Sequence, residues 1–194
     1  SDYPAALDNY QKALDINDRL GNLQATANNY NNIGLVYYSI FDYARALEYY
    51  QKTLKINERT GNKVAMGNIQ GNIGNIYNQL QDYPRAIEYY ENALANSENT
   101  GNLGGVAGNL VNLGNVYTQL KDYKNALDYK QRALKISEQL GRQALIANNL
   151  GNLGNVYIEM GDYPAAIEYH ERAIEIAEKI KDKKTAAPSY ASIG

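Results

Sequence analysis

The sequence of 194 residues has few chemically reactive side chains. It contains no cysteine and no tryptophan, two methionines, one phenylalanine and a single histidine, His170. Without cysteine the chain can form no disulfide, thiol nucleophile or zinc–thiolate site, and one histidine excludes a multi-histidine metal site. No set of nucleophile, base and oxyanion-stabilising groups can be assembled from this inventory. We therefore expect no enzymatic activity, no cofactor and no bound metal.

The chain also lacks an excess of charge and a long apolar run. It has 19 lysines and arginines against 21 aspartates and glutamates, which leaves no basic surface for a polyphosphate backbone. No apolar run approaches the roughly 18 to 20 residues that span a bilayer, and no signal-peptide pattern opens the sequence. These absences predict a protein that binds neither nucleic acid nor membrane, and we expect it in the cytoplasm.

Asparagine and tyrosine are present in excess, with 25 and 19 residues. Each asparagine carboxamide offers two hydrogen-bond donors and an acceptor without a charge. Many neutral hydrogen-bonding groups beside so few nucleophiles favour recognition over catalysis.

The sequence repeats with a spacing of 40 residues and without insertion or deletion. The most regular columns are Asp2, Asp42, Asp82, Asp122 and Asp162, each followed by Tyr, and Gly34, Gly74, Gly114, Gly154 and Gly194. They define complete repeats at 22–61, 62–101, 102–141 and 142–181, with partial repeats at 1–21 and 182–194. A chain of about five such repeats, incomplete at both ends, is expected to stack rather than to close into a globule.

Each repeat is predicted to contain two helices. Asp42 is the expected N-cap of a second helix that ends at Gly61, in the left-handed conformation that glycine adopts easily. The first helix of repeat 102–141 shows one apolar stripe, formed by Val106, Leu110, Leu113, Tyr117 and Leu120. Glycine in the middle of a first helix, such as Gly34, costs about 1 kcal/mol. We expect close approach of the small Ala46 and its equivalents to compensate.

This pattern resembles the tetratricopeptide repeat family. The family spacing of a bulky residue, Leu-Gly, Tyr, Ala and an aromatic is met by Tyr30, Ile33-Gly34, Tyr37, Ala46 and Tyr50. The 40-residue repeat is similar to the Leu-Gly-Asn repeats of spindle-orientation adaptors and to arrays fused to bacterial signalling enzymes. The resemblance implies one all-α domain over residues 1–194, a right-handed superhelical solenoid of antiparallel helix pairs whose first helices line a concave groove.

Charged residues are scarce on the predicted first helices. The four complete windows are 23–39, 63–80, 103–120 and 143–160. Their 71 residues include only two charged ones, Lys63 and Glu159, but 15 of the 25 asparagines. Helical spacing places many of these amides on one stripe opposite the apolar stripe. We call this stripe the amide face; it comprises Asn28, Asn32, Asn68, Asn72, Asn75, Gln79, Asn112, Asn115, Gln119, Asn148, Asn152 and Asn155.

We interpret the amide face as the binding surface for an extended peptide of a partner protein. Carboxamides can pair with peptide N–H and C=O groups whatever the peptide's side chains, and each bond contributes about 0.5–1.5 kcal/mol net. Family members that clamp a carboxylate hold cations on their first helices, whereas the corresponding residues here are Asn31, Gly71, Val111 and Gly151. The expected ligand is therefore neutral or weakly charged.

Several alternatives remain open. The asparagines of the first helices could instead bridge adjacent helices or keep an exposed face hydrated. The whole chain could be a structural spacer, a solenoid that self-assembles end to end, or a regulatory array from a larger signalling protein.

Two further features favour structural interpretations. His170 aligns with Tyr10, Tyr50 and Tyr90, which predicts a packing role rather than that of a base or metal ligand. The glycine-rich segment 101–108 lacks the strand and lysine of a phosphate-binding loop. We interpret this segment as the soft start of a helix and a possible flexing point.

Overall fold

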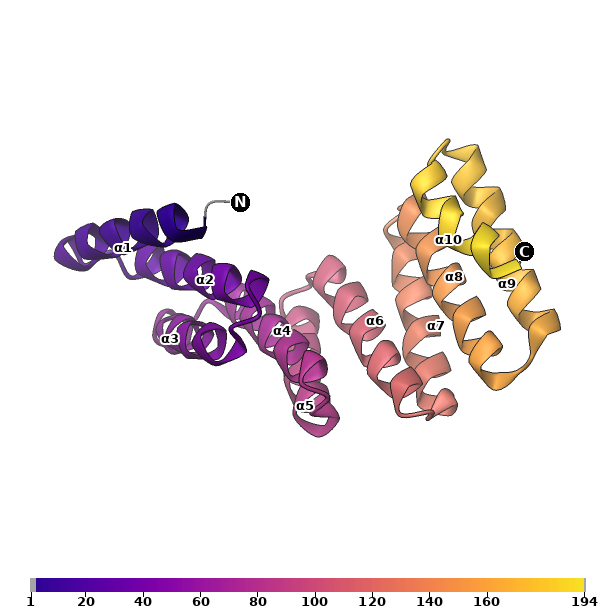
Figure 1. Cartoon of the computed structure of the whole chain (residues 1–194), viewed down its shortest axis with the longest axis horizontal. Helices are drawn as coiled ribbons and strands as arrows, with labels where there is room; N and C mark the ends of the chain where they lie inside the picture. The colour runs from indigo at the N-terminus through magenta and orange to yellow at the C-terminus, as the bar shows by residue number, and fades with distance from the viewer. Residues whose placement is uncertain (1–2, 194) are drawn as a thin grey trace. The chain divides into compact units, whose positions relative to one another are not determined.

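The computed structural model describes residues 3–193, with the side chains of residues 183, 184 and 193 excepted. This part of the chain forms ten α-helices and no strand (Figure 1). They are α1 (Tyr3–Leu20), α2 (Leu23–Ser39), α3 (Tyr43–Thr60), α4 (Lys63–Gln79), α5 (Tyr83–Asn99), α6 (Leu103–Gln119), α7 (Tyr123–Gln139), α8 (Gln143–Met160), α9 (Tyr163–Lys179) and α10 (Lys183–Ile193). Even-numbered helices are the predicted first helices and odd-numbered helices the second ones. The prediction of an all-α repeat of helix pairs is therefore confirmed.

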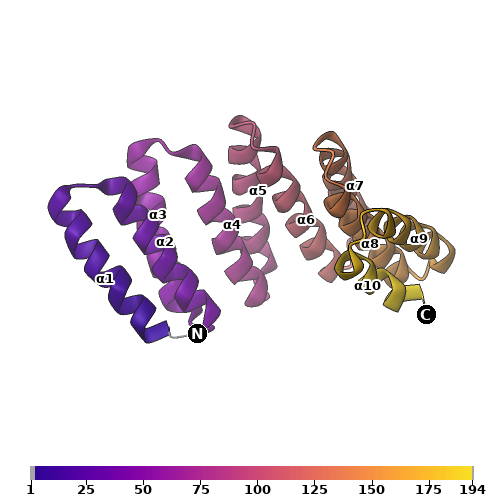
Figure 2. The same ribbon diagram turned by 90° about the horizontal axis from the view of Figure 1, so that it is seen from above.

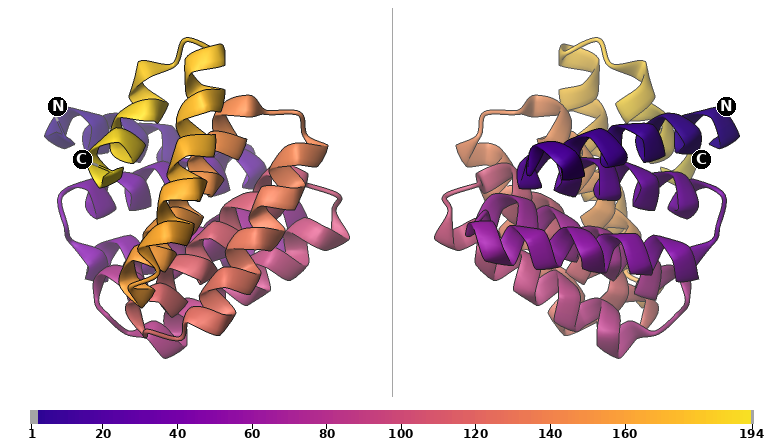
Figure 3. Two further views of the ribbon diagram at one scale, coloured as in Figure 1. Left: turned by 90° about the vertical axis from the view of Figure 1, so that its right-hand side faces the viewer. Right: turned by 90° about the vertical axis from the view of Figure 1, so that its left-hand side faces the viewer.

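The helices form two compact bodies. The N-terminal body spans residues 1–102 and the C-terminal body spans residues 103–194. Within each body every helix packs against the next one along the chain, and α8 also contacts α10. Figure 2 shows the antiparallel hairpins inside each body, and Figure 3 shows α9 and α10 of the C-terminal body in its left view and α1 of the N-terminal body in its right view. None of the helices within residues 3–193 has the length and apolar character of a membrane span.

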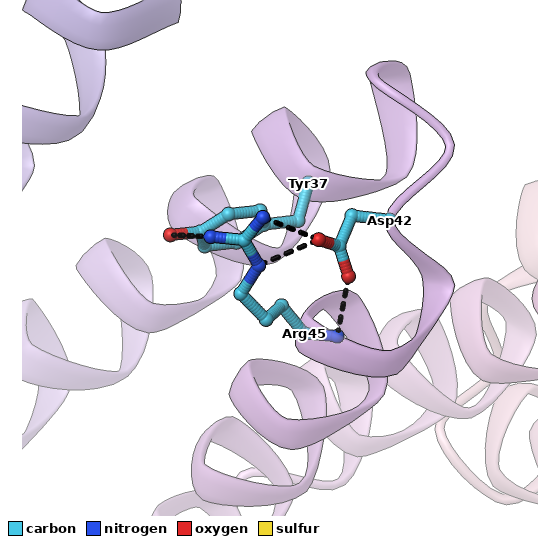
Figure 4. Close-up of polar contacts among 3 residues, drawn as sticks. All are labelled: Tyr37, Asp42 and Arg45. Carbon is cyan, nitrogen blue, oxygen red and sulfur yellow. Dashed lines mark hydrogen bonds and ion pairs between the residues drawn. The ribbon is translucent and has the colours of Figure 1, made fainter.

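The Asp column marks the turn from a first helix to a second one. Asp42 accepts a hydrogen bond from the backbone N–H of Arg45 at 3.0 Å, so it caps α3 as predicted. Its other carboxylate oxygen accepts from Arg45 Nε at 2.6 Å, and the guanidinium lies 4.4 Å from the centroid of the Tyr37 ring (Figure 4). The same cluster recurs one repeat later at Tyr77, Asp82 and Arg85. Each cluster ties the end of one helix to the start of the next.

Both kinds of turn contain a left-handed residue. Gly61, which ends α3, has a φ of 68°, as the sequence predicts. At the turn from a first to a second helix the left-handed residues are Phe41, Gln81, Lys121 and Gly161, with φ of 61°, 58°, 59° and 78°. Only the last of these four positions holds a glycine, so residue type alone could not predict the first three left-handed turns.

Each mid-helix glycine makes room for a side chain from the following second helix. The pairs are Gly34 with Tyr50, Gly74 with Tyr90, Gly114 with Lys130 and Gly154 with His170, and a Cβ added to each glycine would lie 2.7 Å from its partner's side chain. We call these four partners the facing column. The predicted close approach is correct, and Ala126, the equivalent of Ala46, takes part in it with its carbonyl oxygen 3.4 Å from a Cβ added to Gly114. The nearest atoms, however, belong to the facing column. Ala46 is fully buried, yet the atoms nearest to the missing methyl of Gly34 belong to the Tyr50 ring.

Stacked tyrosines also recur in every complete repeat. The pairs are Tyr37 with Tyr49, Tyr77 with Tyr89, Tyr117 with Tyr129 and Tyr157 with Tyr169, with ring centroids 5.3 to 5.5 Å apart. Each pair joins the first helix of a repeat to its second helix. Much of the tyrosine excess therefore serves packing within the hairpins.

The contact between the mid-helix glycines and the facing column predicts opposite effects on stability for two Gly→Ala substitutions. In Gly74→Ala the new methyl would lie 2.7 Å from the buried Tyr90 ring, so we expect a loss of stability, of about 1–3 kcal/mol. In Gly108→Ala the methyl would meet no atom within 4 Å, and the better helix propensity should add up to about 1 kcal/mol. Urea unfolding followed by circular dichroism measures both. Equal shifts in the same direction would contradict this account of the glycine column.

Candidate functional site

The predicted amide face lies on α2, α4, α6 and α8. All twelve of its residues are exposed or partly exposed, and none is buried. Asn32 and Asn72 belong to the N-terminal body, and Asn112 and Asn152 to the C-terminal body. The face is therefore open to solvent in each body.

At one repeated position of this face, α2, α4, α6 and α8 each carry an asparagine without a hydrogen-bond partner among the described residues. These residues, the middle-Asn column, are Asn32, Asn72, Asn112 and Asn152. Within residues 3–193 their side chains make no hydrogen bond, and all four are partly exposed. By contrast, Asn75 accepts from the Tyr90 hydroxyl at 2.7 Å and Asn115 accepts from Lys130 Nζ at 2.5 Å. The middle-Asn column keeps its donors and acceptors available for a ligand.

A different set of amides bridges helices. Asn149 Nδ2 donates to Ser137 Oγ at 2.7 Å and so joins α8 to α7. Asn96 Nδ2 donates to Gln70 Oε1 at 2.7 Å and joins α5 to α4. None of these residues belongs to the amide face. Helix bridging, one of the alternatives for the asparagine excess, thus applies to these residues. It also applies to Asn75 and Asn115 of the amide face, which bond Tyr90 of α5 and Lys130 of α7, but not to the middle-Asn column.

A pocket of about 450 Å³ lies on the C-terminal body between α6 and α8. Asn112, Asn148 and Asn152 of the amide face line it, together with Asn149 and with Ser137 of α7. Its apolar lining comes from Gly104, Ala107, Gly108, Val111 and Leu145. This volume falls within the range of protein ligand pockets. Three predicted residues from two helices thus meet at one cavity.

Arg142 also lines this pocket, at the N-cap position of α8. The side chain is exposed, caps no backbone N–H, and forms no ion pair with any residue that the structure describes. Four other arginines pair with carboxylates, namely Arg45, Arg85, Arg132 and Arg172, whereas Arg19 and Arg59, like Arg142, form no ion pair among the described residues. The charge count along the sequence missed Arg142 because it stands one residue before the window 143–160.

Lys130, in the facing column, is a second cation that the sequence reasoning missed. Its stem packs against Gly114, and its Nζ reaches Asn115 on the amide face, although the residue as a whole is only 3% exposed. Burial lowers the pKa of Lys130 to about 8, because a low-dielectric surrounding disfavours the charged ammonium. The sequence did contain a signal for this residue, because Lys130 aligns with Tyr50 and Tyr90 in the repeat. The first helices alone carry almost no charge, but the amide face does receive this cation.

His170 has the packing role that its column predicts. It is 2% exposed and its imidazole lies against Gly154. Neither ring nitrogen finds a hydrogen-bond partner among the described residues, and burial lowers the pKa of His170. A small cavity of about 100 Å³ beside it is also lined by Asn152, Asn155 and Ser189. In the described part of the chain no group of three or more His, Asp or Glu side chains is placed to hold a metal ion.

A model of the tetratricopeptide repeat family matches residues 1–59, 65–136 and 105–179. The chain therefore belongs to the tetratricopeptide repeat family. Repeats of this family generally mediate protein–protein interaction and generally form non-enzymatic scaffolds. No curated protein matched the sequence.

Solved structures of similar fold are also helical repeat proteins. BtubC (BKLC) from P. vanneervenii is 27% identical with a TM-score of 0.85, over 93% of this chain and 75% of that one. The apo form of RapI is 23% identical with a TM-score of 0.86, over 96% and 52%. The signal transduction ATPase PH0952 from Pyrococcus horikoshii, which has a tetratricopeptide repeat sensor, is 20% identical with a TM-score of 0.78, over 87% and 26%.

The chain thus spans about half the length of RapI and about a quarter of PH0952. With the family match, these likenesses confirm the predicted fold class, an all-α helical repeat solenoid. The extent of the array as a single domain over residues 1–194 stays a prediction.

Replacing the buried ammonium should stabilise the protein in a pH-dependent way. Lys130→Met is expected to raise the free energy of unfolding at pH 7 by about 2 kcal/mol, because no charge is then buried. The pKa of Lys130 is about 8 in the folded chain and 10.5 without burial. The loss of stability caused by the buried ammonium is therefore complete below pH 8 and decreases as the pH rises from 8 to 10.5. Urea unfolding from pH 7 to 10 should show the gap between the two proteins shrinking. A constant gap would contradict a buried charge.

His170 predicts a loss of stability in acid. Below its ordinary pKa of 6.5 the unfolded chain takes up a proton that the buried imidazole does not, so wild-type stability falls as pH decreases. The slope can reach about 1.4 kcal/mol per pH unit. His170→Tyr, which restores the residue found at Tyr50 and Tyr90, should remove this slope. Thermal melting between pH 7.5 and pH 5 compares the two proteins, and parallel profiles would refute the assignment.

Proposed function

We propose that the chain binds an extended peptide segment of a partner protein along its amide face. The observation that carries this proposal is the middle-Asn column, with one partly exposed and unpartnered carboxamide at the same position of four first helices. Such a side chain can donate to a peptide carbonyl and accept from a peptide N–H. An extended peptide offers these groups at regular intervals, so a repeated column of amides suits it.

The energetics favour a ligand of neutral or weakly charged character. Uncharged amides lose less on leaving water than charged groups do. Each hydrogen bond between an asparagine and the peptide backbone contributes about 0.5–1.5 kcal/mol net. A few such bonds therefore offset only part of the free-energy cost of association. The amide face would therefore supply orientation and moderate affinity, and side-chain pockets beside it would supply specificity.

A purely solvating role explains the amide face less well. Asparagine is a poor helix former, whereas Glu and Lys favour helices and keep an exposed face hydrated. The bridging role is filled by residues outside the middle-Asn column, such as Asn149, Asn96, Asn75 and Asn115. A repeated cost in helix propensity at exposed positions is better explained by a ligand that uses those amides.

Peptides selected by display on the immobilised chain, then measured by isothermal titration, test this proposal. The double change Asn112→Ala and Asn152→Ala should weaken binding about tenfold, because two unpartnered amides are lost. Both residues line the same pocket and are partly exposed, so the fold should be kept. The matched control is Gln131→Ala with Gln139→Ala, which removes two exposed carboxamides from α7 and should leave affinity unchanged.

The two failures differ in meaning. An unchanged dissociation constant in Asn112→Ala, Asn152→Ala, with an unchanged unfolding midpoint, would overturn the amide face as the binding surface. If none of the selected peptides binds the wild-type chain, the proposal of peptide binding itself is overturned.

A further inference from the structure

The pocket between α6 and α8 lies where one repeat lacks side chains that the others have. Gly104 and Gly108 of α6 align with Gln24 and Asn28 of α2, and with Val64 and Asn68 of α4. A Cβ added to Gly108 would meet no atom within 4 Å, so the space beside it is open. The helix is continuous through these glycines, from Leu103 to Gln119. The glycine-rich segment therefore creates a hollow on the amide face of this repeat.

The polar lining of the hollow is suited to an anion. It comes from Asn112, Asn148, Asn149, Asn152, Ser137 and Arg142, and it includes no carboxylate. Asn149 and Ser137 are buried and hydrogen-bonded to each other, so Asn112, Asn148, Asn152 and Arg142 remain for a ligand. Arg142 has no carboxylate partner among the residues described in the structure. A guanidinium presents several N–H donors in a planar fork that matches a carboxylate.

We propose that this pocket receives a glutamate side chain of the bound peptide, with its carboxylate paired to Arg142 and its methylenes against Val111 and Leu145. The inference rests on the proposed function, because the glutamate enters as part of a peptide lying on the amide face. One acidic residue in an otherwise neutral segment is the weakly charged ligand that the sequence predicts.

An aromatic occupant is disfavoured by the same residues. Ala107, Val111 and Leu145 alone would suit a ring. However, a ring that filled the hollow would remove water from Arg142 and the amides without offering acceptors in return, and unpaired buried polar groups are costly. A carboxylate supplies hydrogen-bond acceptors for these groups, whereas an aromatic ring does not.

The test compares glutamate with glutamine, which has nearly the same shape and no charge. Each position of a selected peptide is replaced in turn by Glu and by Gln, and affinities are measured by titration. At one position Glu should bind at least about fivefold more tightly than Gln. The preference should weaken as salt is raised, because Arg142 is exposed.

Two variants of the protein locate this preference in the pocket. Arg142→Asn should abolish it, and the fold should be kept because Asn22 and Asn62 are the N-caps of α2 and α4. The matched control is Arg172→Gln on α9, which removes the same charge from the same body outside the pocket and should leave the preference intact.

Gly108→Leu fills the hollow and leaves residue 142 an arginine. Its Cβ meets no atom within 4 Å, so the unfolding midpoint should not fall. The variant should bind the glutamate peptide at least about fivefold more weakly and lose the preference for Glu over Gln.

The outcomes separate this inference from the proposal on which it rests. Equal affinity for Glu and Gln at every position, or a preference that survives in Arg142→Asn, would overturn the glutamate pocket. If Asn112→Ala, Asn152→Ala still weakens binding in that case, the amide face stands. A preferred aromatic at the position sensitive to Gly108→Leu would likewise overturn the inference. If no peptide binds at all, both are overturned.

Discussion

The contact between a mid-helix glycine and a side chain of the next helix is the constraint on which the rest of each repeat depends. Because Gly74 has no Cβ, the Tyr90 ring can lie across α4 and its hydroxyl can reach Asn75. A methyl at that glycine would occupy the space of the ring. The same contact therefore packs the hairpin and brings a polar group from the second helix to the amide face.

The facing column gives each repeat a different local chemistry on one backbone arrangement. Tyr90 brings a neutral donor to Asn75, whereas Lys130 brings an ammonium to Asn115. His170 lines a small cavity with Asn152 and Asn155, and both of its ring nitrogens lack a hydrogen-bond partner among the described residues. Burial favours the neutral forms of Lys130 and His170, since it lowers the pKa of both. Packing geometry is thus repeated while polarity is not.

Features that depend on local sequence could be predicted without the structure. The two helices of each repeat follow from periodicity, and Asp42 and Gly61 mark helix ends because capping is a property of neighbouring residues. The amide face also follows from helical spacing. Lys130 and Arg142 were not predicted because only the charges within the first helices were counted. Lys130 belongs to a second helix, and Arg142 stands at an N-cap position just before the counted range. The pocket is lined by residues of α6, α7 and α8 together, so no single helix predicts it.

The facing column also separates two kinds of change in the sequence. A substitution on the outer stripe of a first helix alters what that helix shows directly. A substitution in the facing column alters the same surface from inside the protein, through a residue that is almost entirely hidden, as the 3% exposure of Lys130 illustrates. Duplicated repeats with identical first helices can therefore diverge in what they recognise, and a comparison restricted to surface residues would not detect the divergence.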